Sequence, residues 1–177
     1  MSEKIAVHWF RQDLRIKDNP SLEAASKCDS FIPIYILDDT NSGEFKMGSA
    51  SRWWLYHSLN KLNESLGGSL RFFKGDPCEI LPKLIEDYSV SNVFWNRCYE
   101  PWRIDRDKKI KNELETNNKI VESFCGSLLW EPWNISKDDG TPYRVFTPYY
   151  KKGCLNASEP RLPISEPSFE NISKKDN

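Results

Sequence analysis

Four clusters of charged, polar and aromatic side chains follow apolar runs and carry the residues of this chain that are suited to binding a ligand. The first cluster, Arg11–Asp18, holds two arginines and two aspartates directly after the apolar run Ile5–Phe10. The other three clusters are Asp38–Asp39, Gly48–Trp54 and Asn96–Arg103. They add carboxylates, indole rings and the free amides of a helix start. Two interpretations stay open: these groups bind a ligand, or they hold the protein to itself through Arg–Asp pairs.

Several common binding and catalytic motifs are missing. A dinucleotide-binding domain has G-x-G-x-x-G after its first strand, but no glycine precedes Gly43. A P-loop, a G-x-S-x-G elbow, an H-E-x-x-H and an EF-hand loop are also absent. Five scattered cysteines without C-x-x-C, together with only His8 and His57, predict no metal site and free thiols in a reducing compartment.

The composition predicts a soluble globular chain. It has 177 residues, of which 38% are hydrophobic and 29% charged, enough for one domain and a tail. The net charge of −1 gives no general attraction to nucleic acid or to an anionic membrane. No signal peptide and no apolar run of ~20 residues is present, so we expect a cytoplasmic protein.

Short apolar runs alternate with longer amphipathic ones along the chain. The expected strands are Ile5–Phe10, Phe31–Leu37, Leu70–Lys74, Asn92–Asn96 and Lys119–Phe124. The expected helices are Pro20–Lys27, Ser49–Leu66 with a cap at Ser49 or Ser51, Pro77–Tyr88 and Trp102–Asn117. This pattern predicts an α/β fold, a five-stranded parallel Rossmann-like doubly wound sheet with helices on both faces. The strand order would reverse beside the first strand, so the loops after the first and fourth strands should line a crevice there.

From about Asn156 the composition changes to prolines spaced among polar residues. Such a segment is expected to be an extended linker that does not pack. We therefore predict an α/β domain over residues 1–155 and a linker over 156–177. A linker with nothing after it suggests that the chain once continued or was cut.

Four motifs occur in a fixed order: Trp9-Phe10-Arg11-Gln12-Asp13-Leu14-Arg15 with Asp18-Asn19, Gly48–Leu55, Trp95–Pro101 with Arg106-Asp107, and Gly140–Lys151. Together they resemble the N-terminal domain of the DNA photolyase/cryptochrome family over roughly residues 4–155. The sequence looks most like a class I bacterial cyclobutane pyrimidine dimer photolyase.

The resemblance implies a light-harvesting role. In the family, an N-terminal α/β domain binds an antenna chromophore and a larger C-terminal helical domain holds FAD, binds ultraviolet-damaged DNA and repairs it. This chain resembles the first part only. It is therefore expected to be the antenna domain of a deoxyribodipyrimidine photolyase, without catalytic residues or metal of its own. Its expected partner is the FAD-binding helical domain, and it would meet DNA only through that domain.

The resemblance also implies a set of antenna-binding residues: Trp9, Phe10, Arg11, Asp38, Arg52, Cys98 and Glu100. Glu100 and Arg52 match deazaflavin-binding relatives and would hydrogen-bond the polar edge of the pigment, while Trp9, Phe10 or Trp54 would cover its faces. Cys98 departs from the acidic residue of those relatives. Trp102-Arg103 departs from the Asn-Glu pair of folate-binding ones. A deazaflavin, a reduced folate and an empty site all stay open.

Other interpretations remain. The chain is also consistent with a cryptochrome fragment, a generic nucleotide-binding α/β module, or a fragment without independent function. Residue by residue, the Arg11–Asp18 cluster is consistent with a salt-bridged turn, Glu100 with a helix cap, and the aromatic rings with core packing.

Overall fold

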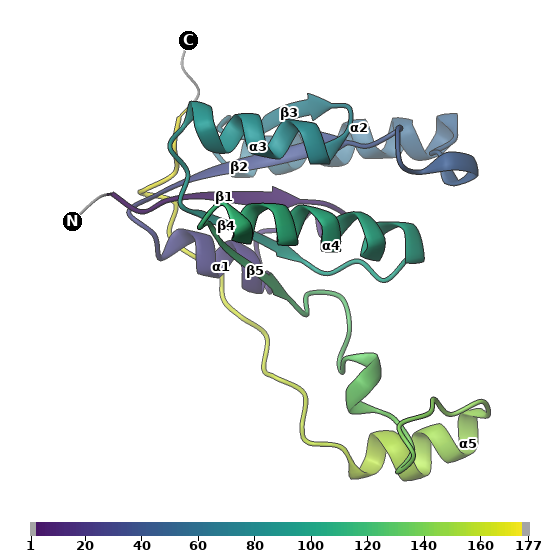
Figure 1. The fold of residues 1–177 in the computed structure, drawn as a ribbon. Coiled ribbons are helices and arrows are strands. Elements are labelled where there is room, and N and C mark those ends of the chain that lie inside the picture. The colour runs from purple at the N-terminus through teal and green to yellow at the C-terminus, as the bar shows by residue number, and fades with distance from the viewer. Residues whose placement is uncertain (1–2, 175–177) are drawn as a thin grey trace. The chain divides into compact units, whose positions relative to one another are not determined.

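Five parallel strands in the order β3-β2-β1-β4-β5 form the sheet at the centre of the fold (Figure 1). The computed structural model describes residues 3–174. The strands are β1 (Ile5–Phe10), β2 (Ser30–Leu37), β3 (Arg71–Lys74), β4 (Asn92–Asn96) and β5 (Ile120–Phe124). The helices between them are α1 (Pro20–Ser26), α2 (Ser49–Ser65), α3 (Pro77–Asp87) and α4 (Pro101–Thr116). The predicted α/β fold is confirmed, and each of these elements begins and ends within one residue of its expected bounds.

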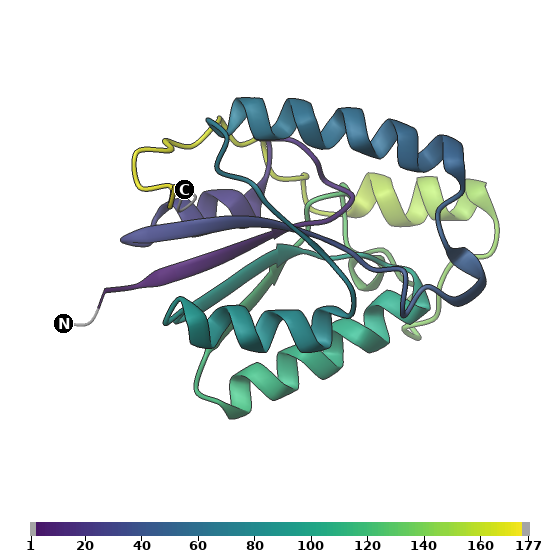
Figure 2. The same cartoon turned by 90° about the horizontal axis from the view of Figure 1, so that it is seen from above.

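The two faces of the sheet are covered by different helices, α1 and α2 on one side and α3 and α4 on the other (Figure 2). Successive side chains of a strand point to opposite faces. Trp9 of β1 therefore packs in the core under α3 and α4, whereas its neighbour Phe10 packs in the core under α1 and α2. β2 is buried on both faces, as its continuous apolar run predicts.

Local capping explains where the helices begin. The Asn19 side chain accepts a hydrogen bond from Leu22 N at 3.2 Å, and Asp76 accepts one from Cys78 N at 2.9 Å. The expected serine cap of α2 is wrong, because Gly48 occupies the cap position and has no side chain to accept a hydrogen bond.

Residues 164–174 return to the sheet unit. Asp18 N donates to Ile164 O at 2.8 Å, and Phe31 exchanges backbone hydrogen bonds with Asn171 and Ser173. Phe169 and Ile172 pack against the core under α1 and α2. The expectation of a linker that does not pack is therefore wrong for this stretch. Its side chains Phe169 and Ile172 pack against the core, and its backbone pairs with that of Phe31 in β2.

The chain divides into two units, and the division differs from the predicted boundary at residue 155. One unit contains the residues up to Gly126 and those from Ile164 onward, and the other is Ser127–Pro163. The second unit carries the short helix α5 (Phe146–Pro148), which continues into further helical turns through Asn156. Within this unit Gly153 lies directly against Ile135 and Tyr143. No helix among residues 3–174 is long and apolar enough to cross a membrane.

Gly126 follows β5 and is buried directly beside Asn96, whose amide donates to Asp13 and Asn19. A Cβ at this position would overlap the Asn96 side chain. We expect Gly126→Ala to lower the free energy of unfolding by about 1–3 kcal/mol, the usual cost of overpacking. Urea unfolding measures the change. Gly48→Ala is the control: nothing lies within 4 Å of its Cβ position, and alanine at this helix cap costs about 1 kcal/mol or less. An equal or larger loss at Gly48 would contradict the expectation.

Candidate ligand-binding site

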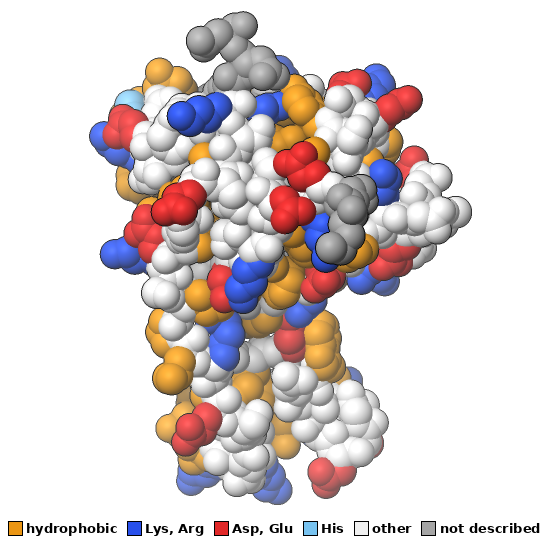
Figure 3. Space-filling view, turned by 90° about the vertical axis from the view of Figure 1, so that its left-hand side faces the viewer, with side chains coloured by type: hydrophobic (Ala, Val, Ile, Leu, Met, Phe, Trp, Pro, Cys, Tyr) orange, Lys and Arg blue, Asp and Glu red, His pale blue; other side chains and the backbone are white. Residues whose placement is uncertain are grey.

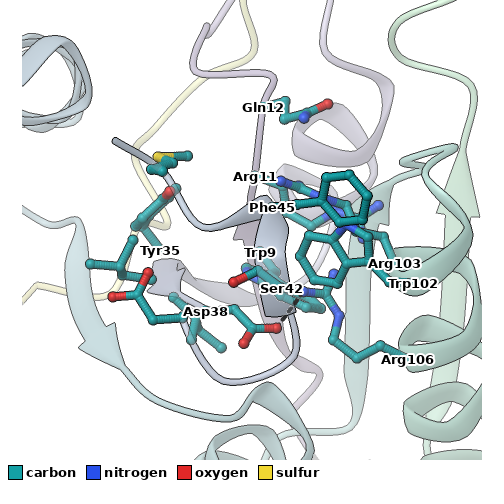
Figure 4. Close-up of a pocket in the computed structure, with 14 residues that line it drawn as sticks. Trp9, Arg11, Gln12, Tyr35, Asp38, Ser42, Phe45, Trp102, Arg103 and Arg106 are labelled. Carbon is teal, nitrogen blue, oxygen red and sulfur yellow. Dashed lines mark hydrogen bonds and ion pairs between the residues drawn. The ribbon is translucent and has the colours of Figure 1, made fainter. Parts of the chain in front are cut away.

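A crevice opens at the carboxyl ends of β1 and β2, beside the point where the strand order reverses between β1 and β4 (Figure 4). Its cavity measures about 50 Å³. The lining residues are Trp9, Arg11, Gln12, the run Tyr35–Asp39, Ser42, Phe45, Met47, Trp102, Arg103 and Arg106. The crevice lies where the sequence predicted it. The first two turns of α4 line it, in place of the loop that precedes this helix.

Ion pairs join the crevice walls. Arg106 donates to Asp38 at 2.8 Å and to Asp107 at 2.8 and 3.1 Å, and Arg11 pairs with the other oxygen of Asp107. The guanidinium carbons of Arg11 and Arg106 lie 5.2 and 4.9 Å from the centre of the Trp9 ring. This stacking adds cation–π attraction to the ion pairs. Arg11 therefore anchors α4 to the end of β1.

The Arg11–Asp18 cluster does more than form a salt-bridged turn. The Asp13 carboxylate accepts from the Arg11 backbone amide at 3.0 Å and from the Asn96 side chain, and so it caps the loop. The carboxylate partner of the Arg11 side chain lies on α4. Arg15 and Asp18 do form an ion pair inside the cluster, at 3.9 Å.

A groove of about 710 Å³ adjoins the crevice and shares four of its lining residues. The shared residues are Arg11, Gln12, Tyr35 and Met47. The rest of the groove is formed by the loop after β1 and by one side of α2, with Ala50, Ser51, Trp54, Leu55 and Ser58. It is much larger than the crevice and has mixed apolar and polar walls.

Trp54 lines this groove and also a second one of about 540 Å³ that continues along α2. Its side chain is 70% exposed. Trp53 is 64% exposed but lines none of the three cavities, and its ring packs against His57 with centres 4.4 Å apart. Of the two adjacent indoles, Trp54 therefore faces these cavities and Trp53 does not, as the helical spacing predicts.

The predicted site residues fall into groups with different surroundings. Trp9, Arg11 and Asp38 line the crevice. Arg52 lies beside it and donates to Asp39 at 2.7 Å and to Met47 O at 3.0 Å. The hydrogen bond from Arg52 holds the pKa of the Asp39 carboxyl below its usual value.

Glu100 and Cys98 lie near the crevice without lining it. Glu100 accepts a hydrogen bond from Gln12 at 2.7 Å and lies 3.6 Å from Arg103 Nε. It occupies the cap position of α4 but makes no side-chain cap. Cys98 is buried 3.5 Å from Arg103 Nη1, and burial raises the pKa of its thiol. The thiol is therefore protonated and a poor nucleophile at neutral pH.

The prediction for Phe10 is wrong. Its side chain is completely buried in the core under α1 and α2, on the sheet face opposite to Trp9. Strand alternation sends these two neighbours to opposite faces, so only Trp9 reaches the crevice.

The sequence missed several lining residues: Tyr35, Ser42, Met47, Trp102, Arg103 and Arg106. On α4, Arg106 follows Trp102 by four positions and Arg103 by three, the spacings that make helical residues neighbours, and this signal was available. Ser42 lies in a polar loop and gave no signal. Burial raises the pKa of Tyr35 to about 12, so the phenol stays neutral.

Known proteins resemble the chain over nearly its whole length. The family model described as DNA photolyase matches residues 6–168. The chain belongs to the DNA photolyase family. The deoxyribodipyrimidine photo-lyase of Agrobacterium fabrum is 39% identical over 94% of this chain, and Cryptochrome-2 of Arabidopsis thaliana is 36% identical over 93%.

Solved structures of this family have the same fold. A bacterial class III photolyase from Agrobacterium tumefaciens superposes with a TM-score of 0.86 at 35% identity and covers all of this chain. The archaeal photolyase from Sulfolobus tokodaii, solved with two FAD molecules, has a TM-score of 0.75 at 23% identity over 97% of the chain. These matches support the family, while the more specific class I assignment stays a prediction.

The relatives are much longer than this chain. It spans 35% of the Agrobacterium fabrum protein, 28% of the Arabidopsis protein and 38% of the class III photolyase chain.

No group of three or more His, Cys, Asp or Glu side chains within residues 3–174 is placed to hold a metal ion.

Proposed function

We propose that this chain is the light-harvesting domain of a photolyase and that its antenna pigment binds in the groove beside Trp54. The observation that carries the proposal is this groove of about 710 Å³ with an exposed indole on its wall. Sites for cofactors of this size occupy about 300–1,000 Å³ and combine apolar walls with a few polar groups. The crevice, at about 50 Å³, is too small for the rings of a pigment.

The surrounding groups suit a planar polar pigment. Trp54 offers an open ring face for stacking, and Met47 and Leu55 supply apolar contact. Arg11 and Gln12 supply hydrogen bonds where the groove meets the crevice. We retain a deazaflavin and a reduced folate as the candidate pigments, and the archaeal photolyase with its two FAD molecules adds FAD as a third. Trp9, Asp38, Arg52, Cys98 and Glu100 belong to the surroundings of this site.

The chain's own groups support energy collection rather than chemistry. The carboxylates and guanidiniums of the crevice are engaged with one another, and the Cys98 thiol is protonated. In the view of Figure 3, acidic and basic side chains are interspersed, and the net charge is −1. DNA binding uses clustered Lys and Arg to neutralise phosphates. We therefore propose that FAD chemistry and contact with damaged DNA belong to a further helical domain, which is the partner of this one.

A cryptochrome is the second candidate, because two Arabidopsis cryptochromes are 36% and 31% identical to this chain. In a light receptor the same groove would serve the same collecting role. Repair of ultraviolet-irradiated DNA by this chain joined to the proposed helical domain would separate the two candidates.

Pigment titration tests the proposed site. A reduced folate, a deazaflavin and FAD are each added to the purified chain while pigment fluorescence is followed. We expect at least one to bind at micromolar concentration and Trp54→Ala to weaken it about 10-fold or more, since stacking of a planar ring on an aromatic side chain contributes about 1–3 kcal/mol.

Trp53→Ala is the matched control, because it removes a similarly exposed neighbouring indole that does not line the groove. We expect it to leave the affinity within about twofold. If none of the three pigments binds, or if both variants weaken binding equally, the proposed site is wrong.

A further inference from the structure

Unsatisfied polar atoms gather at the crevice. Seven buried side-chain nitrogen or oxygen atoms within residues 3–174 have no hydrogen-bond partner in the protein. Four of them belong to residues that line the crevice: Trp9 Nε1, Arg11 Nε, Ser42 Oγ and Arg103 Nε. Three of these residues are almost fully buried, with 1% of Trp9, 5% of Arg11 and 4% of Ser42 exposed. Buried polar groups are nearly always hydrogen-bonded, so this concentration in one small cavity needs an explanation.

Most of these atoms are hydrogen-bond donors. An indole Nε1–H and a guanidinium Nε–H can only donate, whereas a serine hydroxyl can also accept. The acceptors nearby are already engaged, because Asp38 binds Arg106 and Asp39 binds Arg52. Arg103 Nε is 3.6 Å from the nearest Glu100 oxygen, beyond hydrogen-bond distance. Of the four unpaired buried atoms, three can only donate, and the fourth, Ser42 Oγ, can donate or accept.

We propose that the crevice is a subsite for an oxygen acceptor, a carbonyl, carboxylate or phosphate oxygen, held by Trp9 Nε1 and Ser42 Oγ with help from Arg11 and Arg103. Figure 4 shows these side chains around the same cavity, with Trp9 and Ser42 next to the Asp38–Arg106 ion pair. A volume of about 50 Å³ holds one such polar group and excludes a ring system. Each unpaired buried N–H group lowers the stability of the folded protein, so a ligand that accepts a hydrogen bond from it is favoured.

Continuity with the groove indicates where the acceptor comes from. The crevice and the groove share Arg11, Gln12, Tyr35 and Met47. A pigment whose rings lie beside Trp54 can therefore extend a carbonyl, carboxylate or phosphate group into the crevice. This source rests on the proposed function. A separate small anion would satisfy the same donors without it.

Ser42→Ala and Trp9→Phe each remove one donor while keeping most of the side chain. We expect each variant to weaken pigment binding about 5- to 10-fold, the range for one lost hydrogen bond. Ser69→Ala is the control, because Ser69 is a buried serine that lines none of the three cavities. The unfolding midpoint of the ligand-free Ser42→Ala variant should stay unchanged, since Ser42 Oγ makes no hydrogen bond in the protein. A purely structural serine would show the reverse, a loss of stability with unchanged binding.

A second arm replaces the pigment with inorganic phosphate and follows the thermal unfolding of the wild type and of Ser42→Ala. If pigment affinity falls in both donor variants, the acceptor belongs to the pigment. If only phosphate distinguishes the wild type from Ser42→Ala, the acceptor is a separate anion, and the subsite stands even when no pigment binds. If neither ligand distinguishes the variants from the wild type, the acceptor subsite is refuted, whatever the outcome for Trp54.

Discussion

Replacing Asp107 with asparagine is expected to lower the free energy of unfolding by about 3–5 kcal/mol, the usual cost of breaking a buried ion pair from one side. Asp107 is the carboxylate partner of Arg11 and the second partner of Arg106, and these two side chains are only 2% and 4% exposed. The variant leaves Arg11 without a carboxylate in a place that water scarcely reaches. Urea unfolding at neutral pH measures the loss.

The matched control is Glu115→Gln on the same helix. Glu115 pairs with Lys111 at 3.7 Å, and both side chains are about half exposed. Surface pairs of this kind contribute about 0–1 kcal/mol, and salt should weaken this pair while leaving the effect at Asp107 almost unchanged. A loss below about 1 kcal/mol at Asp107 would mean that water or another group compensates the two guanidiniums.

This ion-pair cluster also shows why the site was harder to predict than the fold. Strands and helices follow from local patterns, and β1 and β4 occupy the ranges that the sequence predicts for them. Arg11 and Asp107 are 96 positions apart. Their pairing depends on how α4 packs over the end of β1, which no local pattern encodes. The sequence identified Arg11 as polar and well placed, and left open whether it served a ligand or the protein.

Other failures have equally specific causes. Phe10 was predicted with Trp9 from the family resemblance, although strand alternation places the two rings on opposite faces of the sheet. Residues 164–174 look like a linker because polar and proline residues outnumber Phe169 and Ile172, yet those two side chains reach a core that the earlier part of the chain forms. The unit Ser127–Pro163 has no apolar periodicity long enough to predict its short helical turns.

The free energy of unfolding is expected to fall strongly as the pH is lowered, because of His8. This side chain is completely buried in β1, its ring lies 4.2 Å from that of Phe10, and neither ring nitrogen has a hydrogen-bond partner in the protein. Burial lowers the pKa of His8 to about 4, with Arg11 acting in the same direction and Asp13 against it. The imidazole is therefore neutral in the folded protein at pH 7.

The sign of the effect follows from the two states. The unfolded chain binds a proton at His8 below its ordinary pKa of 6.5, whereas the folded protein does so only near pH 4. The contribution of His8 to the free energy of unfolding is therefore fully present above pH 6.5 and is lost as the pH falls toward 4. Each pH unit in this window costs about 1.4 kcal/mol, so about 2 kcal/mol is lost by pH 5 and about 3 kcal/mol by pH 4.

His8→Leu isolates this contribution, because leucine fills similar space and does not titrate. Urea unfolding of both proteins at pH 7 and pH 5 is compared. We expect the wild type to lose about 2 kcal/mol more than the variant over this interval, while carboxylates titrate alike in both and cancel in the difference. Parallel losses would show that His8 keeps an ordinary pKa in the folded protein, which would require water or a proton acceptor at its ring nitrogens. A larger loss in the variant would reverse the sign and place a protonated histidine inside the sheet.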